Sequence, residues 1–200
     1  DSMIFASSGI GASGTIYRST NNGNNWFVFN SGLPSSVMYR LASVSGKVYA
    51  CGSSPGFYDT TDKGTSWQYL TGFPANSFTT TLIQRGNIVF TTYGLPSSFA
   101  SITTNGGNNW IHFTSDFTEG YLKNVLFTSN SMLGFSAAGV HRSTNLGVNW
   151  ISSNSGIDQI NIYNIVANNN NVVLNSYSGV YRSSNFGNNW ALLGLQNKYV

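Results

Sequence analysis

The sequence predicts an all-β protein, a β-propeller of four-stranded antiparallel blades with five repeats visible. An eight-residue motif that ends in tryptophan occurs five times and contains all five tryptophans of the chain. Successive motif tryptophans stand 41, 43, 40 and 40 residues apart. A fixed period of this size is typical of repeat architectures. No segment has the periodicity of an amphipathic helix, so we expect strands throughout.

The motif has the form [Ser/Thr]-x-[Asn/Asp]-x-Gly-x-x-Trp, and its residue types are those of a tight turn. A hydroxyl or Asx side chain bonds backbone groups a few residues on, and glycine adopts a positive φ without steric cost. The tryptophan then starts the next strand and buries a large apolar surface. The motif therefore predicts a β-hairpin at Ser19, Asn21, Gly23, Trp26; Thr60, Asp62, Gly64, Trp67; Thr103, Asn105, Gly107, Trp110; Ser143, Asn145, Gly147, Trp150; and Ser183, Asn185, Gly187, Trp190.

These five copies resemble the Asp-box, or BNR repeat, whose pattern is S-x-D-x-G-x-x-W. The resemblance covers essentially the whole chain and implies a propeller similar to those of sialidases, sortilin-type receptors, xyloglucan-degrading enzymes and photosystem II assembly factors. It also implies that each box joins the third and fourth strands of a blade. Four boxes carry Asn where the family has Asp, and only Asp62 keeps the acid. Asn makes the same side-chain bond, so we expect the turn to survive the change.

The strands follow in the same order in each repeat: strand, turn, strand, loop, strand, box, strand. We expect one propeller domain over 1–200, with repeats at 1–29, 30–70, 71–113, 114–153 and 154–193. The first repeat lacks an inner strand, and residues 194–200 begin the next inner strand or close the ring; we favour a part of something longer. The expected strands are 3–6, 15–18 and 27–29; 37–44, 47–51 and 56–59; 78–84, 88–92 and 101–102; 121–128, 132–136 and 140–142; and 160–167, 172–175 and 180–182.

Composition narrows the possible functions. Charged residues make up only 8% of the chain, and Gly, Ser, Thr and Asn take their place. Such a surface suits a secreted or cell-surface protein. The net charge of +3 arises without a basic cluster, so we expect no nucleic-acid partner. No apolar run reaches the ~20 residues of a membrane span. Cys51 is the only cysteine, and its strand context predicts a buried thiol.

An enzymatic reading needs catalytic acids, and these are scarce. Glycoside hydrolysis uses a pair of carboxylates, and Asp116 with Glu119 is the only plausible pair. Arg18, Arg142 and Arg182 stand at one position of three repeats, which favours a structural role over a sialidase-type cluster. His112 and His141 have no metal-ligand spacing around them. We therefore expect no catalytic residue, metal or cofactor.

Binding is the preferred reading. Loops opposite the box hairpins carry Phe73, Tyr93, Phe117, Glu119 and Tyr177 among Ser, Gly and Asn, a mixture that suits sugar or peptide recognition. The alternative is that each aromatic packs a loop onto its blade. The sequence thus predicts a non-enzymatic binding or scaffold module for glycan or protein. Two alternatives stay open: a fragment of a sialidase-like or xyloglucanase-like glycoside hydrolase, and an assembly factor that docks a protein partner.

Overall fold

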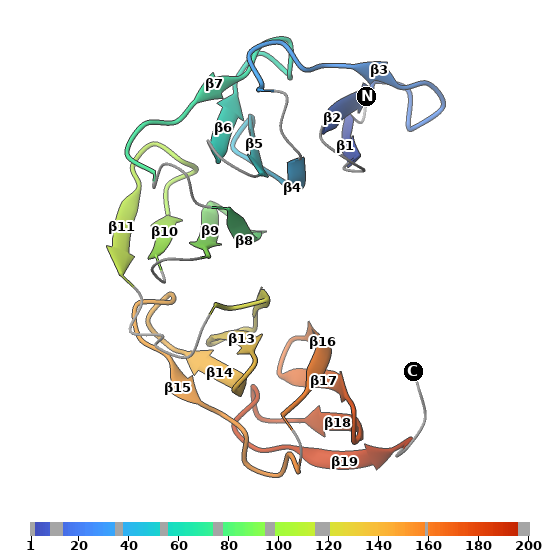
Figure 1. Cartoon of the computed structure of the whole chain (residues 1–200), viewed down its shortest axis with the longest axis vertical. Coiled ribbons are helices and arrows are strands. Elements are labelled where there is room, and N and C mark those ends of the chain that lie inside the picture. Colours follow the sequence, from blue (N-terminus) through green and yellow to red (C-terminus); the bar gives the residue numbers. More distant parts are fainter. Residues whose placement is uncertain are drawn as a thin grey trace. The chain divides into compact units, whose positions relative to one another are not determined.

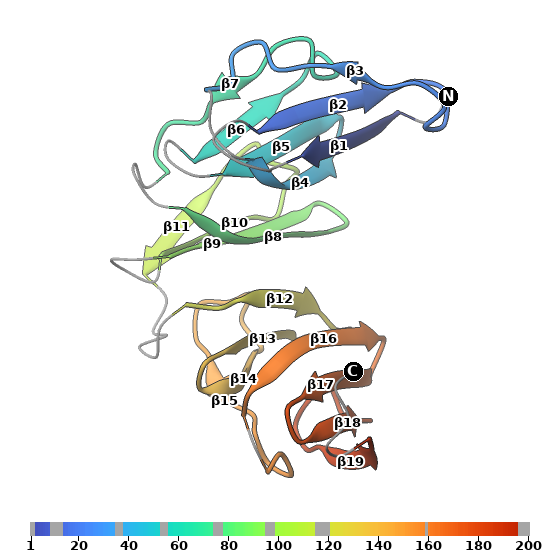
Figure 2. The same cartoon turned by 45° about the vertical axis from the view of Figure 1, so that its right-hand side comes forward.

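The structure is a computed structural model that describes residues 3–8, 14–34, 38–52, 56–73, 78–94, 99–114, 121–158 and 160–195. Nineteen strands in these ranges form five sheets (Figures 1 and 2). Sheet 1 has three strands and the other four sheets have four each, ordered as in the chain. Within the described residues this confirms the expected blade, including a first repeat without an inner strand.

The strands have the following bounds. Sheet 1 contains β1 (Ile4–Ser8), β2 (Thr15–Ser19) and β3 (Phe27–Val28). Sheet 2 contains β4 (Met38–Val44), β5 (Lys47–Gly52), β6 (Phe57–Thr60) and β7 (Gln68–Tyr69), and sheet 3 contains β8 (Thr79–Arg85), β9 (Ile88–Tyr93), β10 (Phe99–Thr103) and β11 (Ile111–Thr114). Sheet 4 contains β12 (Asn124–Phe127), β13 (Met132–Ser136), β14 (Gly139–Ser143) and β15 (Ile151–Ser152), and sheet 5 contains β16 (Ile162–Asn168), β17 (Asn171–Ser176), β18 (Gly179–Ser183) and β19 (Ala191–Gly194).

The chain divides into two compact units. One comprises Asp1–Pro96 with Ser101–His112, and the other comprises Ser97–Ala100 with Phe113–Val200. Sheets 1 and 2 lie in the first unit, and sheets 4 and 5 lie in the second. The expectation of a single propeller domain over 1–200 stays a prediction. So does the role of residues 194–200, of which Gly194 ends β19 and 196–200 lie outside the described residues.

All five boxes form the same hairpin between the last two strands of their sheet. In the first box the backbone N–H of Gly23 donates to Ser19 Oγ at 2.9 Å. Asn21 Oδ1 accepts from the Ser19 hydroxyl at 3.0 Å and from the backbone N–H of Asn25 at 2.9 Å. The other four boxes repeat these three bonds with Asn or Asp at the third position. The prediction that Asn preserves the turn is therefore confirmed.

The residue before each box glycine is also left-handed, which the sequence did not reveal. Asn22, Lys63, Leu146 and Phe186 have φ between 58° and 61°, and Gly106 has 70°. A left-handed conformation suits Asn and Gly but costs roughly 1–2 kcal/mol for other L-residues. The boxes with Leu146 and Phe186 therefore carry backbone strain that their bonds and packing offset.

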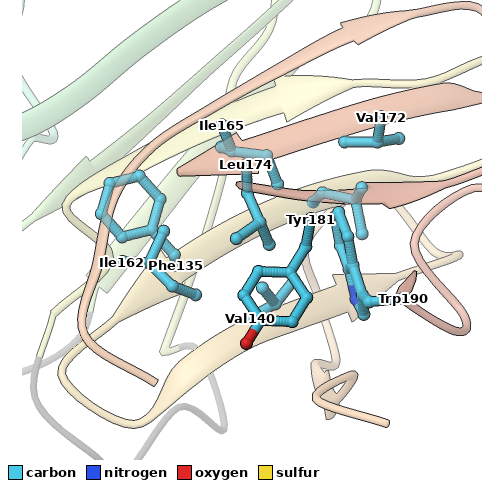
Figure 3. Packing of buried hydrophobic residues seen from close by; sticks show 9 residues of the cluster. Phe135, Val140, Ile162, Ile165, Val172, Leu174, Tyr181 and Trp190 are labelled. Atoms are coloured by element: carbon cyan, nitrogen blue, oxygen red, sulfur yellow. The ribbon is translucent and has the colours of Figure 1, made fainter. Parts of the chain in front are cut away.

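Hydrophobic clusters fill the space between consecutive sheets of each unit. The cluster between sheets 4 and 5 contains Val140 of one sheet with Leu174, Tyr181 and Trp190 of the other (Figure 3), and Leu133 of sheet 4 also belongs to it. In the first unit, Ile16 of sheet 1 packs with sheet 2, and Tyr49 and Phe57 of sheet 2 pack against sheet 3 in two further clusters. The box tryptophans Trp67 and Trp190 belong to these clusters, so they hold neighbouring sheets together.

The box glycine also receives a side chain from the preceding sheet. A Cβ atom added to Gly64 would lie 2.7 Å from Phe5 Cε1, and one on Gly187 would lie 2.8 Å from Leu133 Cδ1. Tyr49 occupies the same place against Gly107. Glycine is thus required at these boxes for its positive φ and for its lack of a side chain.

Candidate functional site

The five residues predicted to bind a ligand have different positions. Phe73 is 7% exposed and Tyr93 is 1% exposed, both within the cluster between sheets 2 and 3. Tyr177 is 54% exposed in the turn after β17. Phe117 and Glu119 lie outside the described residues, as does Asp116. Phe73 and Tyr93 belong to one compact unit of the chain, and Tyr177 belongs to the other.

Phe73 and Tyr93 have the environment of core residues. The Phe73 ring stacks on Phe57 with centroids 4.3 Å apart, and it meets Trp110 edge-on at 5.1 Å. The Tyr93 ring lies 6.3 Å from Phe73. Because protein atoms cover both rings, neither offers a face to a surface ligand. The loop-packing alternative therefore describes these two positions.

Two of the described acids, Asp62 and Asp59, are hydrogen-bonded and buried, respectively. Asp62 accepts bonds from the hydroxyls of Thr60 and Ser66, at 2.7 and 2.6 Å, and from the Ser66 backbone N–H. These bonds lower the pKa of Asp62 to about 2. Asp59 is 9% exposed, and its burial raises the pKa of its carboxyl, against the opposing charge of Lys47. Neither carboxylate lines the groove described below.

The sequence did not indicate two serine–histidine pairs: Ser136 Oγ lies 3.2 Å from His141 Nε2, and the other pair joins Ser101 to His112. Ser101 Oγ lies 2.8 Å from His112 Nδ1, and burial lowers the pKa of the His112 imidazole. The His112 ring also meets Phe73 edge-on at 4.8 Å. Ser101 is only 1% exposed, so a substrate carbonyl has no route to its hydroxyl. This pair therefore fixes β10 against β11 and does not form a nucleophile.

The arginines that precede the boxes act locally. Arg18 donates from Nη1 to the carbonyl of Lys63 at 2.6 Å and lies over the Phe29 ring, 3.6 Å from its centroid. It thereby ties sheet 1 to the box of sheet 2. Arg182 donates from Nη2 to Asn171 Oδ1 of its own sheet at 2.6 Å. A structural role was the expectation for these positions, and these bonds agree with it.

A groove of about 600 Å³ lies between β1 of sheet 1 and the β4–β5 hairpin of sheet 2. The strands β1 and β4 lie side by side here (Figures 1 and 2). β1 is the edge strand of a three-stranded sheet, because among the described residues this sheet has no equivalent of the inner strands β4, β8, β12 and β16. The groove is lined by Met3, Ile4, Phe5, Leu41, Ala42, Ser43, Val44, Ser45, Gly46, Lys47, Val48 and Lys63.

The groove is apolar with two cations. Met3 and Ile4 are 36% and 37% exposed. Lys63 is exposed and forms no ion pair among the described residues. Lys47 Nζ donates to the carbonyl of Gly107 at 3.2 Å. The sequence predicted that the first repeat lacks an inner strand, but it did not indicate this groove, which no motif marks. It also lies beside the second box, not opposite the box hairpins where binding was expected.

Other site types find no support among the residues that the structure describes. No group of three or more His, Cys, Asp or Glu side chains there could hold a metal ion. In the part of the chain that the structure describes, there is no helix long and apolar enough to cross a membrane. Cys51 is fully buried, and its burial raises the pKa of the thiol to about 12. The expectation of a buried strand thiol is confirmed.

No protein-family model matches the chain, and no curated protein matches it either. Solved structures do. An ancestral GH74 enzyme superposes with a TM-score of 0.73 at 22% identity, over 98% of this chain and 30% of that one. The GH74 xyloglucanase from Xanthomonas campestris gives 0.70 at 13% identity, over 95% of this chain and 37% of that one. YCF48 bound to D1 peptide gives 0.62 at 20% identity, over 92% of this chain and 64% of that one.

These similarities establish the fold. The five sheets match the blades of β-propeller structures, so the all-β propeller prediction is confirmed. The chain spans about a third of the length of the GH74 proteins and under two thirds of YCF48 in that complex.

Proposed function

We propose that this chain is a non-catalytic binding or scaffold module of a secreted or cell-surface protein. We further propose that its groove beside β1 recognises an extended protein segment with apolar and acidic side chains. The observation that carries this proposal is an apolar groove that runs along an edge strand and has Lys63 and Lys47 at its side. The low charge content supports the extracellular location.

Each property of the groove favours an extended peptide. An edge strand presents backbone N–H and C=O groups that can pair with an added strand. The volume of about 600 Å³ lies within the ordinary range of ligand pockets. Apolar walls hold alternate side chains of such a strand, and the exposed Lys63 ammonium attracts a carboxylate. One of the similar structures is YCF48 bound to D1 peptide, and this similarity supports a protein ligand.

A displayed peptide library selected on the intact chain tests this function. We expect selected peptides to share alternating apolar residues with at least one Asp or Glu. Lys63→Asp should weaken their binding about tenfold or more at low salt, with a smaller effect at high salt because salt screens exposed charges. Asp tolerates the left-handed backbone at this position, so the fold is preserved.

Lys123→Asp is the matched control, because Lys123 is an exposed lysine that directly precedes β12 and does not line the groove. Equal losses in both variants would reduce the effect to net charge and overturn the groove assignment. A glycan array is run in parallel. If the chain binds a glycan on the array and no peptide from the library, the ligand is a sugar and not a protein segment.

A glycoside hydrolase is the second candidate, supported by the similarity to two GH74 structures. Its acids would be Asp116 and Glu119, which the sequence places together in one loop, or residues outside this chain. Hydrolysis of xyloglucan or of sialosides by the intact chain, abolished by Asp116→Asn or Glu119→Gln, would establish this function and overturn the non-catalytic proposal.

A further inference from the structure

A four-residue pattern outside the boxes follows the outer strands of sheets 1 and 4. We name residues 30–33, Asn-Ser-Gly-Leu, the first strap, and residues 154–157, Asn-Ser-Gly-Ile, the second strap. The first strap contacts the box of sheet 2 within one compact unit, and the second contacts the box of sheet 5 within the other. The two straps therefore repeat one arrangement in separate parts of the chain, and each can serve as the control for the other.

In each strap the asparagine side chain extends the sheet beyond its outer strand. One residue past β3, the backbone N–H of Phe29 donates to the Ile16 carbonyl at 2.9 Å. The Ile16 N–H then donates to Asn30 Oδ1 at 2.8 Å. The second strap repeats both bonds after β15, at 2.9 and 2.7 Å. Ile16 is fully buried, so water cannot replace the asparagine oxygen as the acceptor of its N–H.

Each strap holds the tryptophan of the next box by two hydrogen bonds. Trp67 donates its backbone N–H to the Ser31 carbonyl and its indole N–H to the Phe29 carbonyl, both at 2.9 Å. Trp190 makes the same two bonds with the second strap and the residue before it, at 2.9 and 2.8 Å. Gly32 has φ +88°, and a Cβ there would overlap the Trp67 carbonyl oxygen. The first strap therefore fixes Trp67 relative to sheet 1.

Trp67 connects the first strap to the groove beside β1. Its ring meets the Phe5 ring edge-on, with centroids 6.4 Å apart, and Phe5 lines the groove. Leu33 of the strap packs against the same cluster as Phe5 and Leu41, and Leu41 lines the wall that sheet 2 provides. Since one wall belongs to sheet 1 and the other to sheet 2, the contact between these sheets sets the width of the groove.

We propose that Asn30 is a positioning residue for the groove and acts through Trp67 and Phe5. Without its side chain, the strap carbonyls are no longer held toward Trp67, and the two walls can shift relative to each other. Asn154 makes the equivalent bonds in the other unit, and no described residue of sheets 4 and 5 lines the groove. The inference rests on the proposed function of the groove only where it concerns a bound peptide.

Hydrogen exchange of the tryptophan indoles, followed by NMR on the intact chain, tests the strap itself. Asn30→Ala should raise the exchange rate of the Trp67 indole N–H about tenfold or more and leave that of Trp190 unchanged. Asn154→Ala should do the reverse. Asn30→Asp keeps an acceptor oxygen and should preserve the slow exchange of Trp67. Unchanged Trp67 exchange in Asn30→Ala overturns the proposal, and so does an equal rise in both tryptophans.

Two readouts then connect the strap to the groove. The methyl resonance of Met3, which lines the groove, should shift in Asn30→Ala and stay in place in Asn154→Ala. The dissociation constant of the tightest peptide from the displayed library should rise about fivefold or more in Asn30→Ala, because a preorganised site is lost, and not in Asn154→Ala.

These readouts separate failure of the strap from failure of the peptide site. If the library yields no peptide, the proposed function fails, while Trp67 exchange and the Met3 resonance still decide this inference. Fast Trp67 exchange in Asn30→Ala with an unchanged Met3 resonance overturns the positioning role. If Asn30→Ala does not fold, Trp67→Phe removes only the indole bond to the Phe29 carbonyl and takes its place, with Trp190→Phe as the control. An unchanged Met3 resonance in Trp67→Phe then overturns the proposal.

Discussion

The box tryptophan has different neighbours at two interfaces, the one between sheets 4 and 5 and the one between sheets 2 and 3. In the first, segment 153–156 follows the outer strand of sheet 4, and the carbonyls of Ser153 and Ser155 accept both N–H groups of Trp190. In the second, Trp110 lies among the rings of Tyr49, Phe57 and Phe73, and its buried indole N–H has no partner among the described residues.

The difference follows from the few residues after each outer strand. Asn154 Oδ1 accepts the backbone N–H of Val140 at 2.7 Å, which fixes a turn whose carbonyls face Trp190. Sheet 2 has Thr71-Gly72-Phe73 at the corresponding place, one residue shorter before its glycine, and inserts the Phe73 ring instead. Hydrogen bonds between the turn and Trp190 and aromatic stacking on Trp110 are thus two ways of joining neighbouring sheets. The two interfaces should respond differently to mutation.

Replacing the turn glycines should separate the two interfaces most strongly. Gly156 has φ +89°, and a Cβ there would overlap the Trp190 carbonyl, so Gly156→Ala should lower the free energy of unfolding by more than about 2 kcal/mol. Gly72 has the same φ, but its nearest neighbour would be His112 Nε2 at 3.7 Å. Gly72→Ala should cost about 1 kcal/mol, from backbone strain alone. Urea unfolding measures both changes in the free energy of unfolding. Equal losses in the two variants would contradict the close contact between Gly156 and Trp190.

Replacing the tryptophans tests the indole bonds. Trp190→Phe leaves the Ser153 carbonyl buried without its donor, whereas Trp110→Phe removes an N–H that has no acceptor among the described residues. An unpaired buried group costs about 1–3 kcal/mol, so the loss in Trp190→Phe should exceed that in Trp110→Phe by about that amount. Both variants lose similar ring area, which makes each the control of the other. A larger loss in Trp110→Phe would refute this account.

The box turns differ in backbone strain, because the residue before the box glycine is not the same in each. Leu146 in the box of sheet 4 and Asn22 in the box of sheet 1 have the same φ of 58°. Leu146→Asn should therefore raise the free energy of unfolding by about 1 kcal/mol, and Asn22→Leu should lower it by a similar amount. Thermal or chemical unfolding of both variants decides. Changes of the same sign would show that packing of the Leu146 side chain outweighs strain.

The smallest expected effect concerns the one acidic box. The pKa of Asp62 is about 2 in the folded chain, below the ~3.9 of an unfolded aspartate, so its charged form stabilises the fold above pH 4. That contribution should fade as the pH falls from about 4 to 2. Asp62→Asn reproduces the other boxes and should remove this part of the pH dependence. Parallel stability curves of parent and variant from pH 5 to 2 would contradict the assignment.

Much of the fold was predictable from the sequence because its signals are local. The hydroxyl, Asx and glycine residues of each box satisfy one another within five positions, so the hairpins and the strand order followed from the motif. Several strand boundaries were wrong by one to three residues. The largest error is at 121–128, where the strand spans only Asn124–Phe127, and the strand expected at 101–102 spans Phe99–Thr103. The Lys123 N–H still bonds the Phe135 carbonyl, but residues before it leave the sheet.

The candidate site was less predictable. Phe73 and Tyr93 look like loop aromatics in the sequence, and only their contacts with Phe57 and Trp110 reveal a core role. The groove beside β1 has no motif, because it exists where a strand is absent from sheet 1. Local patterns identify which residues bond each other nearby and carry little information about which surfaces meet.

The sequence by itself determined five capped hairpins, their spacing and the strand order of each sheet, since side chains within one box satisfy its turn. Only the tertiary structure decided whether a box tryptophan is covered, as Trp190 is, or 40% exposed, as Trp26 is. The physical reason is that an indole is buried by the neighbouring sheet and not by its own turn. The same motif therefore has a tryptophan packed against a neighbouring sheet in one place and a partly exposed tryptophan in another.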